Sequence, residues 1–141
     1  MTSDRTLRIC LLVFALAATG CGVFKKTREC NRLALQVNQE LDHIEERAKA
    51  KTPAAYRGVA ASYQRLAKQL RSQPLATPAG VQLTEEYAAF FEAVSPPLEL
   101  HAQALEGKDP NRIAETKRGL EHVTRQQKNL QNRFELFCRP R

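Results

Sequence analysis

The sequence predicts an all-α protein folded as an antiparallel four-helix bundle with up-down-up-down topology. In the chain after residue 20, apolar residues recur at steps of three and four, which is the spacing of one helix face. The same part is rich in Ala, Leu, Gln, Glu, Arg and Lys, which are good helix formers. No segment of it alternates apolar and polar residues with a period of two, so we expect no sheet.

The first expected helix covers about residues 27–50, and the second begins at Thr52-Pro53. A capping threonine followed by proline at the first helical position is a helix start signal. The second helix should end before Pro74, because proline lacks the N–H that continues a helix. The apolar stripe of the first helix is Cys30, Leu33, Val37, Leu41, Ile44 and Ala48. The stripe of the second helix is Tyr56, Val59, Tyr63, Leu66 and Leu70.

The third expected helix begins with the same signal, at Thr77-Pro78, and is closed by Gly107. Pro96 and Pro97 interrupt it, yet the apolar spacing continues in phase across them. We therefore expect one helix with a sharp kink at Pro96-Pro97 rather than two separate helices. Its stripe is Val81, Tyr87, Phe90, Phe91, Val94, Leu98, Ala102 and Leu105.

The fourth expected helix opens at Asp109-Pro110 and has the most regular stripe, with heptad-like spacing. The stripe is Ile113, Thr116, Leu120, Val123, Gln127, Leu130, Phe134 and Phe137. Its two polar members, Thr116 and Gln127, either fix the register of the bundle or mark a looser, wetter seam. Short connections between the helices favour antiparallel neighbours.

The first 21 residues form a leader of a recognisable kind. Arg5 and Arg8 precede an uncharged apolar run over residues 9–18, and the run Ala18-Thr19-Gly20-Cys21 follows. This arrangement resembles the lipobox signal of bacterial lipoproteins, in which the cysteine is lipidated and becomes the new N-terminus. Two alternatives stay open: an ordinary secretory peptide cut after residue 17, and a retained transmembrane helix. The latter is disfavoured because the run is shorter than the ~20 residues that a bilayer core needs.

The lipoprotein resemblance implies a domain organisation and a location. Residues 1–20 are the signal peptide, residues 21–27 a lipidated tether starting at Cys21, and residues 28–141 the helical bundle. The protein is then attached by its lipid to the periplasmic side of the cell envelope. Gly22 follows the cysteine in place of the aspartate that commonly retains such proteins in the inner membrane, so we expect the outer membrane.

The cysteines predict a disulfide. Cys10 leaves with the signal peptide and Cys21 takes the lipid, which leaves Cys30 and Cys138. In an oxidising compartment such a pair forms a disulfide, the alternative being two buried free thiols. An antiparallel bundle supports the pairing, since the start of the first helix and the end of the fourth lie at the same end. A loop of this size is worth about 4–5 kcal/mol in chain entropy.

Charge is unevenly distributed on this basic chain, whose formal net charge is +7. The second and fourth helices are basic and the third is acidic, which predicts complementary pairing of the third helix with its basic neighbours. A further set of cations, here called the anchored-end basic cluster, is Lys25, Lys26, Arg28, Arg32, Lys68, Arg71, Arg139 and Arg141. The expected topology gathers this cluster at the end that carries Cys21. It either rests on anionic lipid headgroups or forms solvated chain ends.

The sequence predicts a non-enzymatic protein without a metal or cofactor. Nucleophile-elbow and glycine-rich phosphate-loop motifs are absent, as are nucleic-acid-binding motifs. Glu40 and His43 form one E-x-x-H motif, whereas a di-iron bundle needs two and further carboxylates. We therefore expect an interaction or scaffold protein of the envelope, which binds an unidentified envelope protein through a helix face. The alternative is a bundle that binds a small apolar or metal ligand.

Overall fold

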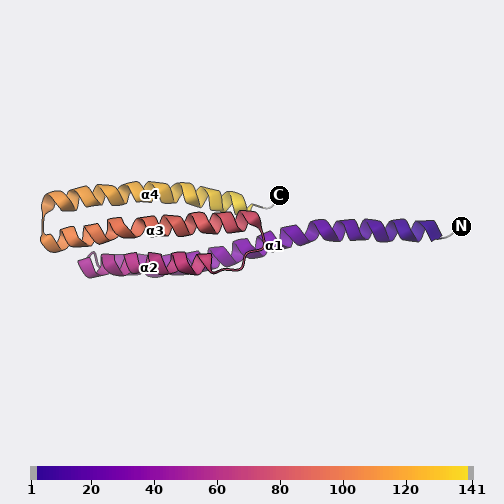
Figure 1. Ribbon diagram of the computed structural model, residues 1–141, viewed down its shortest axis with the longest axis horizontal. Helices are drawn as coiled ribbons and strands as arrows, with labels where there is room; N and C mark the ends of the chain where they lie inside the picture. Colours follow the sequence, from indigo (N-terminus) through magenta and orange to yellow (C-terminus); the bar gives the residue numbers. More distant parts are fainter. Residues whose placement is uncertain (1–2, 140–141) are drawn as a thin grey trace.

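The computed structural model describes the backbone of residues 3–139, and the side chains of residues 24–139 except residue 124. This part of the chain contains four helices and no strand, so the all-α prediction is confirmed (Figure 1). The helices are α1 (Ser3–Ala48), α2 (Pro53–Arg71), α3 (Pro78–Gly107) and α4 (Pro110–Cys138). The side chains of the expected lipobox, including Cys21, lie outside the described residues, as does Arg141.

The starts of α2, α3 and α4 are built as the local signals predict. Each has proline in its first turn and a capping side chain in front of it: Thr52, Thr77 and Asp109. The Thr52 hydroxyl accepts a hydrogen bond from the N–H of Ala55 at 3.1 Å, and Thr77 accepts one from Gly80 at the same distance. Each cap satisfies a backbone donor that the first helical turn leaves unpaired.

Two helix boundaries differ from the expected ones. Helix α1 begins at Ser3 rather than near residue 27, because an apolar stripe marks the packed part of a helix and not its full length. Helix α3 includes Gly107, and the left-handed residue that follows the helix is Lys108, with φ of 51°. The expected closing glycine is therefore one residue too early for the left-handed position that terminates a helix.

Helix α3 is continuous through Pro96 and Pro97. Next to them, the buried Ser95 hydroxyl lies 3.1 Å from the carbonyl oxygen of Ala60 in α2 and 3.2 Å from that of Phe91. One of these bonds crosses between helices. The prolines thus lie where α3 is held closely against α2.

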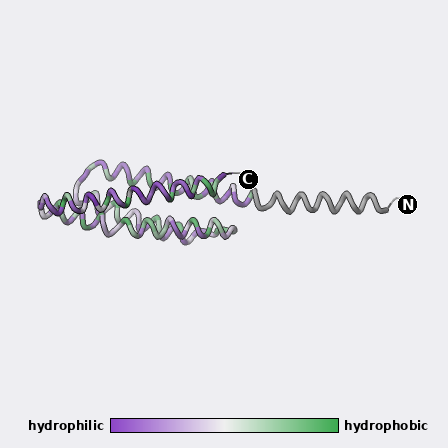
Figure 2. Tube along the Cα trace, turned by 90° about the horizontal axis from the view of Figure 1, so that it is seen from above, coloured by the Kyte–Doolittle hydropathy of each residue, from purple (hydrophilic) through white to green (hydrophobic). Residues whose placement is uncertain are grey.

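The core lies mainly between α1, α2 and α3. One buried cluster is centred on Leu66 and Phe91, near the disulfide, and the other on Val59 and Val94. Hydropathy alternates along the coloured tubes of Figure 2, as amphipathic helices require. Helix α4 takes a small part in this core, because only Leu130 and Phe137 among its described side chains are buried.

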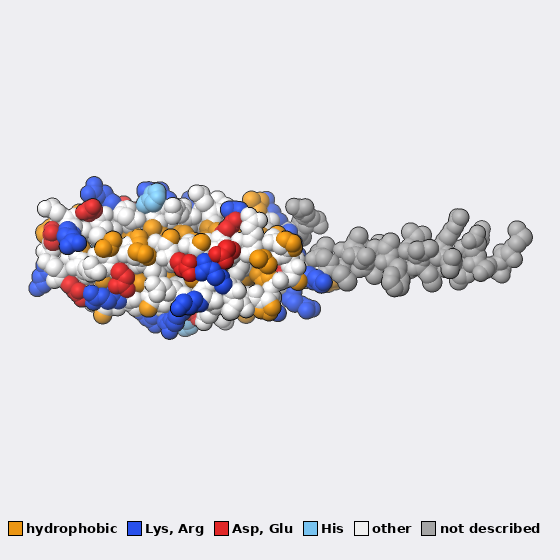
Figure 3. Space-filling view, viewed as in Figure 1, with side chains coloured by type: hydrophobic (Ala, Val, Ile, Leu, Met, Phe, Trp, Pro, Cys, Tyr) orange, Lys and Arg blue, Asp and Glu red, His pale blue; other side chains and the backbone are white. Residues whose placement is uncertain are grey.

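Ion pairs cross the seam between α2 and α3, which confirms the predicted pairing of a basic with an acidic helix. Arg57 donates to Glu106 at 2.5 Å, and Arg71 pairs with Glu85 at 2.8 Å and with Glu92. Figure 3 shows acidic and basic side chains lying next to one another on one face of the bundle. The pairs are solvent-exposed, so they favour the order of the helices more than they stabilise it.

Candidate functional site: a groove between α1 and α4

An apolar groove runs along the bundle between α1 and α4, and α3 lies beneath it. It consists of two adjoining cavities of about 340 and 410 Å³, which share Leu41, Phe90 and Gln127 as lining residues. We call it the α1–α4 groove. Its apolar wall includes Leu41 and Ile44 from α1, Phe90 and Val94 from α3, and Val123 and Phe134 from α4.

The floor of the groove is aromatic and uncharged. The Phe90 ring packs on the buried Phe91 ring, with centroids 5.5 Å apart, and Tyr87 meets Phe134 edge-on at 6.0 Å. Burial, together with the nearby Glu135 carboxylate, raises the pKa of Tyr87 to about 12. Burial likewise raises the pKa of Tyr63. Both phenols therefore stay neutral at physiological pH, and the floor favours apolar groups.

The rim of the groove is polar and carries negative charge. Its uncharged members are the amides Asn38, Gln127 and Gln131. The charged side chains that line the two cavities are both carboxylates, Glu135 on α4 and Glu45 on α1. On a chain with a net charge of +7, this makes the groove a local acidic exception.

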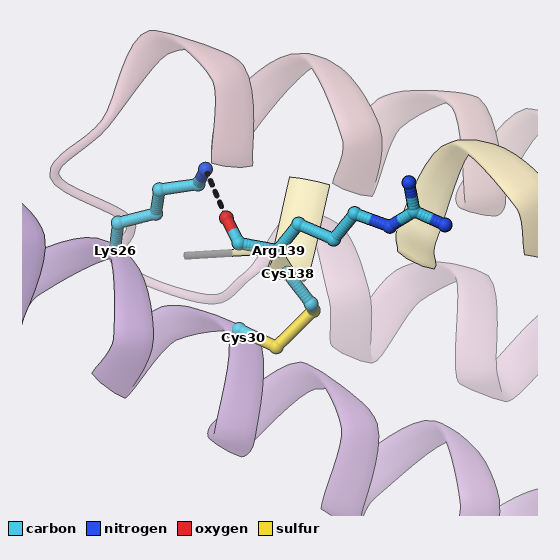
Figure 4. Close-up of a disulfide and its surroundings, with 4 residues drawn as sticks. All are labelled: Lys26, Cys30, Cys138 and Arg139. Carbon is cyan, nitrogen blue, oxygen red and sulfur yellow. Dashed lines mark hydrogen bonds between the residues drawn. A yellow bond between two sulfur atoms is a disulfide. The ribbon is translucent and has the colours of Figure 1, made fainter. Parts of the chain in front are cut away.

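A disulfide joins α1 to α4 at one end of the groove. Cys30 and Cys138 are bonded, with their Cα atoms 5.5 Å apart, so the predicted pairing is confirmed (Figure 4). Beside it, the Lys26 ammonium donates to the carbonyl oxygen of Arg139 at 3.3 Å and lies 5.5 Å from the centre of the Phe137 ring. Helices α1 and α4 therefore meet firmly at this end and diverge along the groove.

A buried carboxylate next to the disulfide connects α1 to the start of α3. Glu29 is only 7% exposed and accepts hydrogen bonds from the backbone N–H groups of Ala76 and Thr77 and from the Thr77 hydroxyl. Burial alone would raise the pKa of Glu29, but these hydrogen bonds outweigh it and hold the pKa below its usual value. Gly80 makes room, since a Cβ atom there would lie 2.8 Å from the carboxylate.

Some residues of the anchored-end basic cluster are engaged in contacts within the protein. The structure brings Lys26 and Arg139 together, while the Arg71 guanidinium is held by two carboxylates of α3. Arg71 is itself exposed, and the other exposed cations of the cluster within the described residues are Lys25, Arg28, Arg32, Lys68 and Arg139. Large apolar side chains accompany them: Phe24 is 76% and Leu136 62% exposed.

His101 has a structural role in the packing of the bundle, whereas His43 and His122 are exposed. His101 is buried, its Nδ1 atom lies 2.8 Å from the Thr116 hydroxyl, and Tyr56 packs edge-on against its ring at 4.7 Å. Burial, with help from Lys117, lowers the pKa of His101. Within the described side chains, no three His, Cys, Asp or Glu residues gather as a metal site would require. Among those same residues, no helix combines the length and apolarity of a membrane-crossing segment.

The groove is a feature that the sequence signals only weakly. Its one local sign is Gln127, one of the two polar residues in the stripe of α4, which is exposed and lines both cavities. Thr116, the other polar member, instead pairs with His101. Comparisons with protein-family models, curated proteins and solved structures found no match to this chain.

Proposed function

We propose that this chain is a lipid-anchored envelope protein that acts as a non-enzymatic interaction module and holds another envelope protein in the α1–α4 groove. The observation that carries the proposal is the groove itself. An apolar, aromatic-floored channel is open to solvent along one side of the bundle, whereas charged pairs cover the α2–α3 side. Exposed apolar surface of this kind, rimmed by polar groups, is typical of a binding site.

The proposed topology is up-down-up-down. The disulfide between Cys30 and Cys138 supports it, because it joins an early part of the chain to the end of α4. The pairing of Arg57 with Glu106 supports it too, since the former lies near the start of α2 and the latter near the end of α3. Such contacts are expected when successive helices run in opposite directions.

A kink in α3 is part of the same proposal. Pro96 and Pro97 lack the N–H groups that would bond the carbonyls of Glu92 and Ala93, and each ring crowds the preceding turn. A bend that opens toward these carbonyls would relieve the crowding. The hydroxyl of Ser95, bonded across to α2, would hold the bent region in place.

The membrane attachment is proposed from the leader and from the anchored end. A lipid on Cys21 would place Phe24 and the exposed basic residues within a few residues of the membrane surface. Cations there are attracted to anionic headgroups by about 1 kcal/mol each. Exposed Phe24 and Leu136 would add apolar contact with the headgroup layer. We expect the outer membrane, on the periplasmic side, because Gly22 follows the cysteine.

A second candidate function is the binding of a small apolar ligand. The observation that favours it is the size of the two cavities, about 340 and 410 Å³, which falls within the usual range of small-molecule pockets. The groove would then hold the ligand against Phe90 and Val123, and no partner protein would be needed.

Reagent access to the groove tests the proposed function. A cysteine in place of Gln127 reports on the groove, and a cysteine in place of Gln64, exposed on α2, is the matched control. A bound partner should slow maleimide labelling at the groove position in isolated native envelopes, relative to the purified protein. Labelling at the control position should be equal in both. Equal labelling at the groove position in both preparations would overturn the proposal.

Cell fractionation tests the anchor. The variant Cys21→Ala should move the chain from the membrane to the soluble periplasm while the Cys30–Cys138 disulfide stays intact. A variant that stays in the membrane fraction would contradict lipidation at this cysteine.

A further inference from the structure

From the shape and charge of the α1–α4 groove, we infer that its occupant is an amphipathic helix whose apolar stripe is flanked by lysine or arginine residues. This inference rests on the proposed function and specifies the kind of partner. It is the helix-in-groove mode of recognition, in which residues at steps of three, four and seven anchor in an apolar channel.

The length of the groove fits a helix. On α1 the lining residues extend from Ala34 to Ala48, and on α4 from Leu120 to Glu135. At 1.5 Å per residue, each wall is about 21–22 Å long, or about four helical turns. Walls from α1 and α4 over a floor from α3, to which Val59 and Tyr63 of α2 contribute, make a channel that suits a rod-shaped occupant.

The charge of the groove selects a cationic occupant. Glu135 lies three residues before the disulfide on α4, and Glu45 lies fifteen residues beyond it on α1. If these helices are antiparallel, as proposed, the two carboxylates are about 18 Å apart along the groove. This distance matches two basic residues about twelve positions apart on a bound helix. A fatty acid or anionic phospholipid would instead bring its negative headgroup toward these carboxylates.

The polar rim also suits a peptide. Asn38, Gln127 and Gln131 offer both donors and acceptors above the apolar floor. A helix that buries one face would present its polar flanks at this height, where amides can bond to polar side chains. The combination of apolar floor, amide rim and terminal carboxylates matches a helix with an apolar stripe and basic flanks.

Tryptophan fluorescence of a synthetic peptide tests the inference on the purified folded protein. The chain contains no tryptophan, so a single tryptophan on the apolar face of the peptide gives the whole signal. The probe is a helical peptide of about 18 residues with an apolar stripe and two lysines about twelve positions apart. We expect saturable binding with a blue-shifted emission. The matched probe, with glutamates in place of the lysines, should bind at least several-fold more weakly.

Charge-removing variants test the two carboxylates. Glu45→Gln and Glu135→Gln keep the size of the side chain, and each should weaken binding of the lysine peptide about two- to fivefold. Glu115→Gln, an exposed carboxylate of α4 that does not line the groove, is the control and should leave the affinity unchanged. Val123→Ser, checked for folding by circular dichroism, should weaken the binding of both peptides because it replaces an apolar side chain in the wall of the groove with a polar one.

The outcomes separate this inference from the proposed function. Equal binding of the two peptides, or equal affinity of the glutamine variants and the wild type, would overturn the cationic helix. Binding of a fluorescent fatty acid in the groove without binding of the lysine peptide would also overturn it, in favour of a small apolar ligand. Self-association that buries the groove would assign the site to a second copy and overturn it as well. The proposed function itself is overturned by a different result, unchanged labelling at Gln127 in native envelopes.

Discussion

At the scale of single residues, the most informative contact is the one between Glu29 and the start of α3. A carboxylate that is 7% exposed would be costly without partners, but this one accepts two backbone N–H bonds and one hydroxyl bond. It also lies at a helix N-terminus, where negative charge is stabilised. The contact fixes α1 against the α2–α3 connection, beside the disulfide that joins α1 to α4.

Glu29→Gln should make the protein less stable at neutral pH and less sensitive to acid. Because the folded pKa lies below the ordinary value, the carboxylate contributes stability that is fully present above about pH 5. That contribution is lost as the pH falls through the folded pKa. We expect a loss of about 1–2 kcal/mol at pH 7, measured by urea unfolding.

The comparison across pH gives the control. The free energies of unfolding of the wild type and Glu29→Gln should converge as the pH falls through the lowered pKa of Glu29, whereas those of the wild type and Glu115→Gln should differ little at any pH. A gap between wild type and Glu29→Gln that stays constant from pH 7 to pH 3 would show that the charge of Glu29 contributes nothing.

At the scale of the helices, local signals and long-range contacts differ in how far they can be predicted. The starts of α2, α3 and α4 follow from a capping residue and a proline, both of which act on their own turn. The C-terminal ends of the helices are less predictable. After α3, Lys108 takes the left-handed position that glycine usually occupies. The bond from Glu29 to Thr77 could not be predicted, because it depends on how the helices pack.

Lys108→Gly should stabilise the protein. With φ at 51°, the lysine holds a conformation that glycine adopts at little cost, so we expect a gain of about 0.5–1 kcal/mol. Thermal unfolding measures the change. The control is Lys117→Gly, an exposed position inside α4, where the same substitution should cost about 1 kcal/mol. Destabilisation by both variants would contradict the strained left-handed conformation at Lys108.

At the scale of the whole molecule, the bundle is closely packed where α2 meets α3 and is open along the α1–α4 groove. Helices α1, α2 and α3 supply most of the buried core, and ion pairs join α2 to α3, while α4 buries only Leu130 and Phe137 among its described side chains. The disulfide could be predicted because the proposed leader accounts for Cys10 and Cys21, which leaves Cys30 and Cys138 as a pair. The groove could not, because apolar stripes show which faces avoid water without showing how closely those faces approach.

Loss of the disulfide should therefore affect α4 first. The bridge between Cys30 and Cys138 spans 108 residues, so its removal by serine at both positions should cost about 4–5 kcal/mol. Hydrogen exchange should show protection lost in α4 before α2, since α4 has few buried side chains. A reductant should leave the double variant unchanged. Uniform loss of protection over all helices would contradict a weakly packed α4.

The most direct measurement of the central claim is photocrosslinking of the full-length protein in the cells that produce it. A photoreactive amino acid in place of Gln127 lies in the groove, and the same group in place of Gln64 lies on the exposed face of α2. We predict a discrete crosslinked species from the groove position only, one that disappears when Val123 is also replaced by serine. Equal crosslinking from both positions, or none from either, would contradict a partner held between α1 and α4.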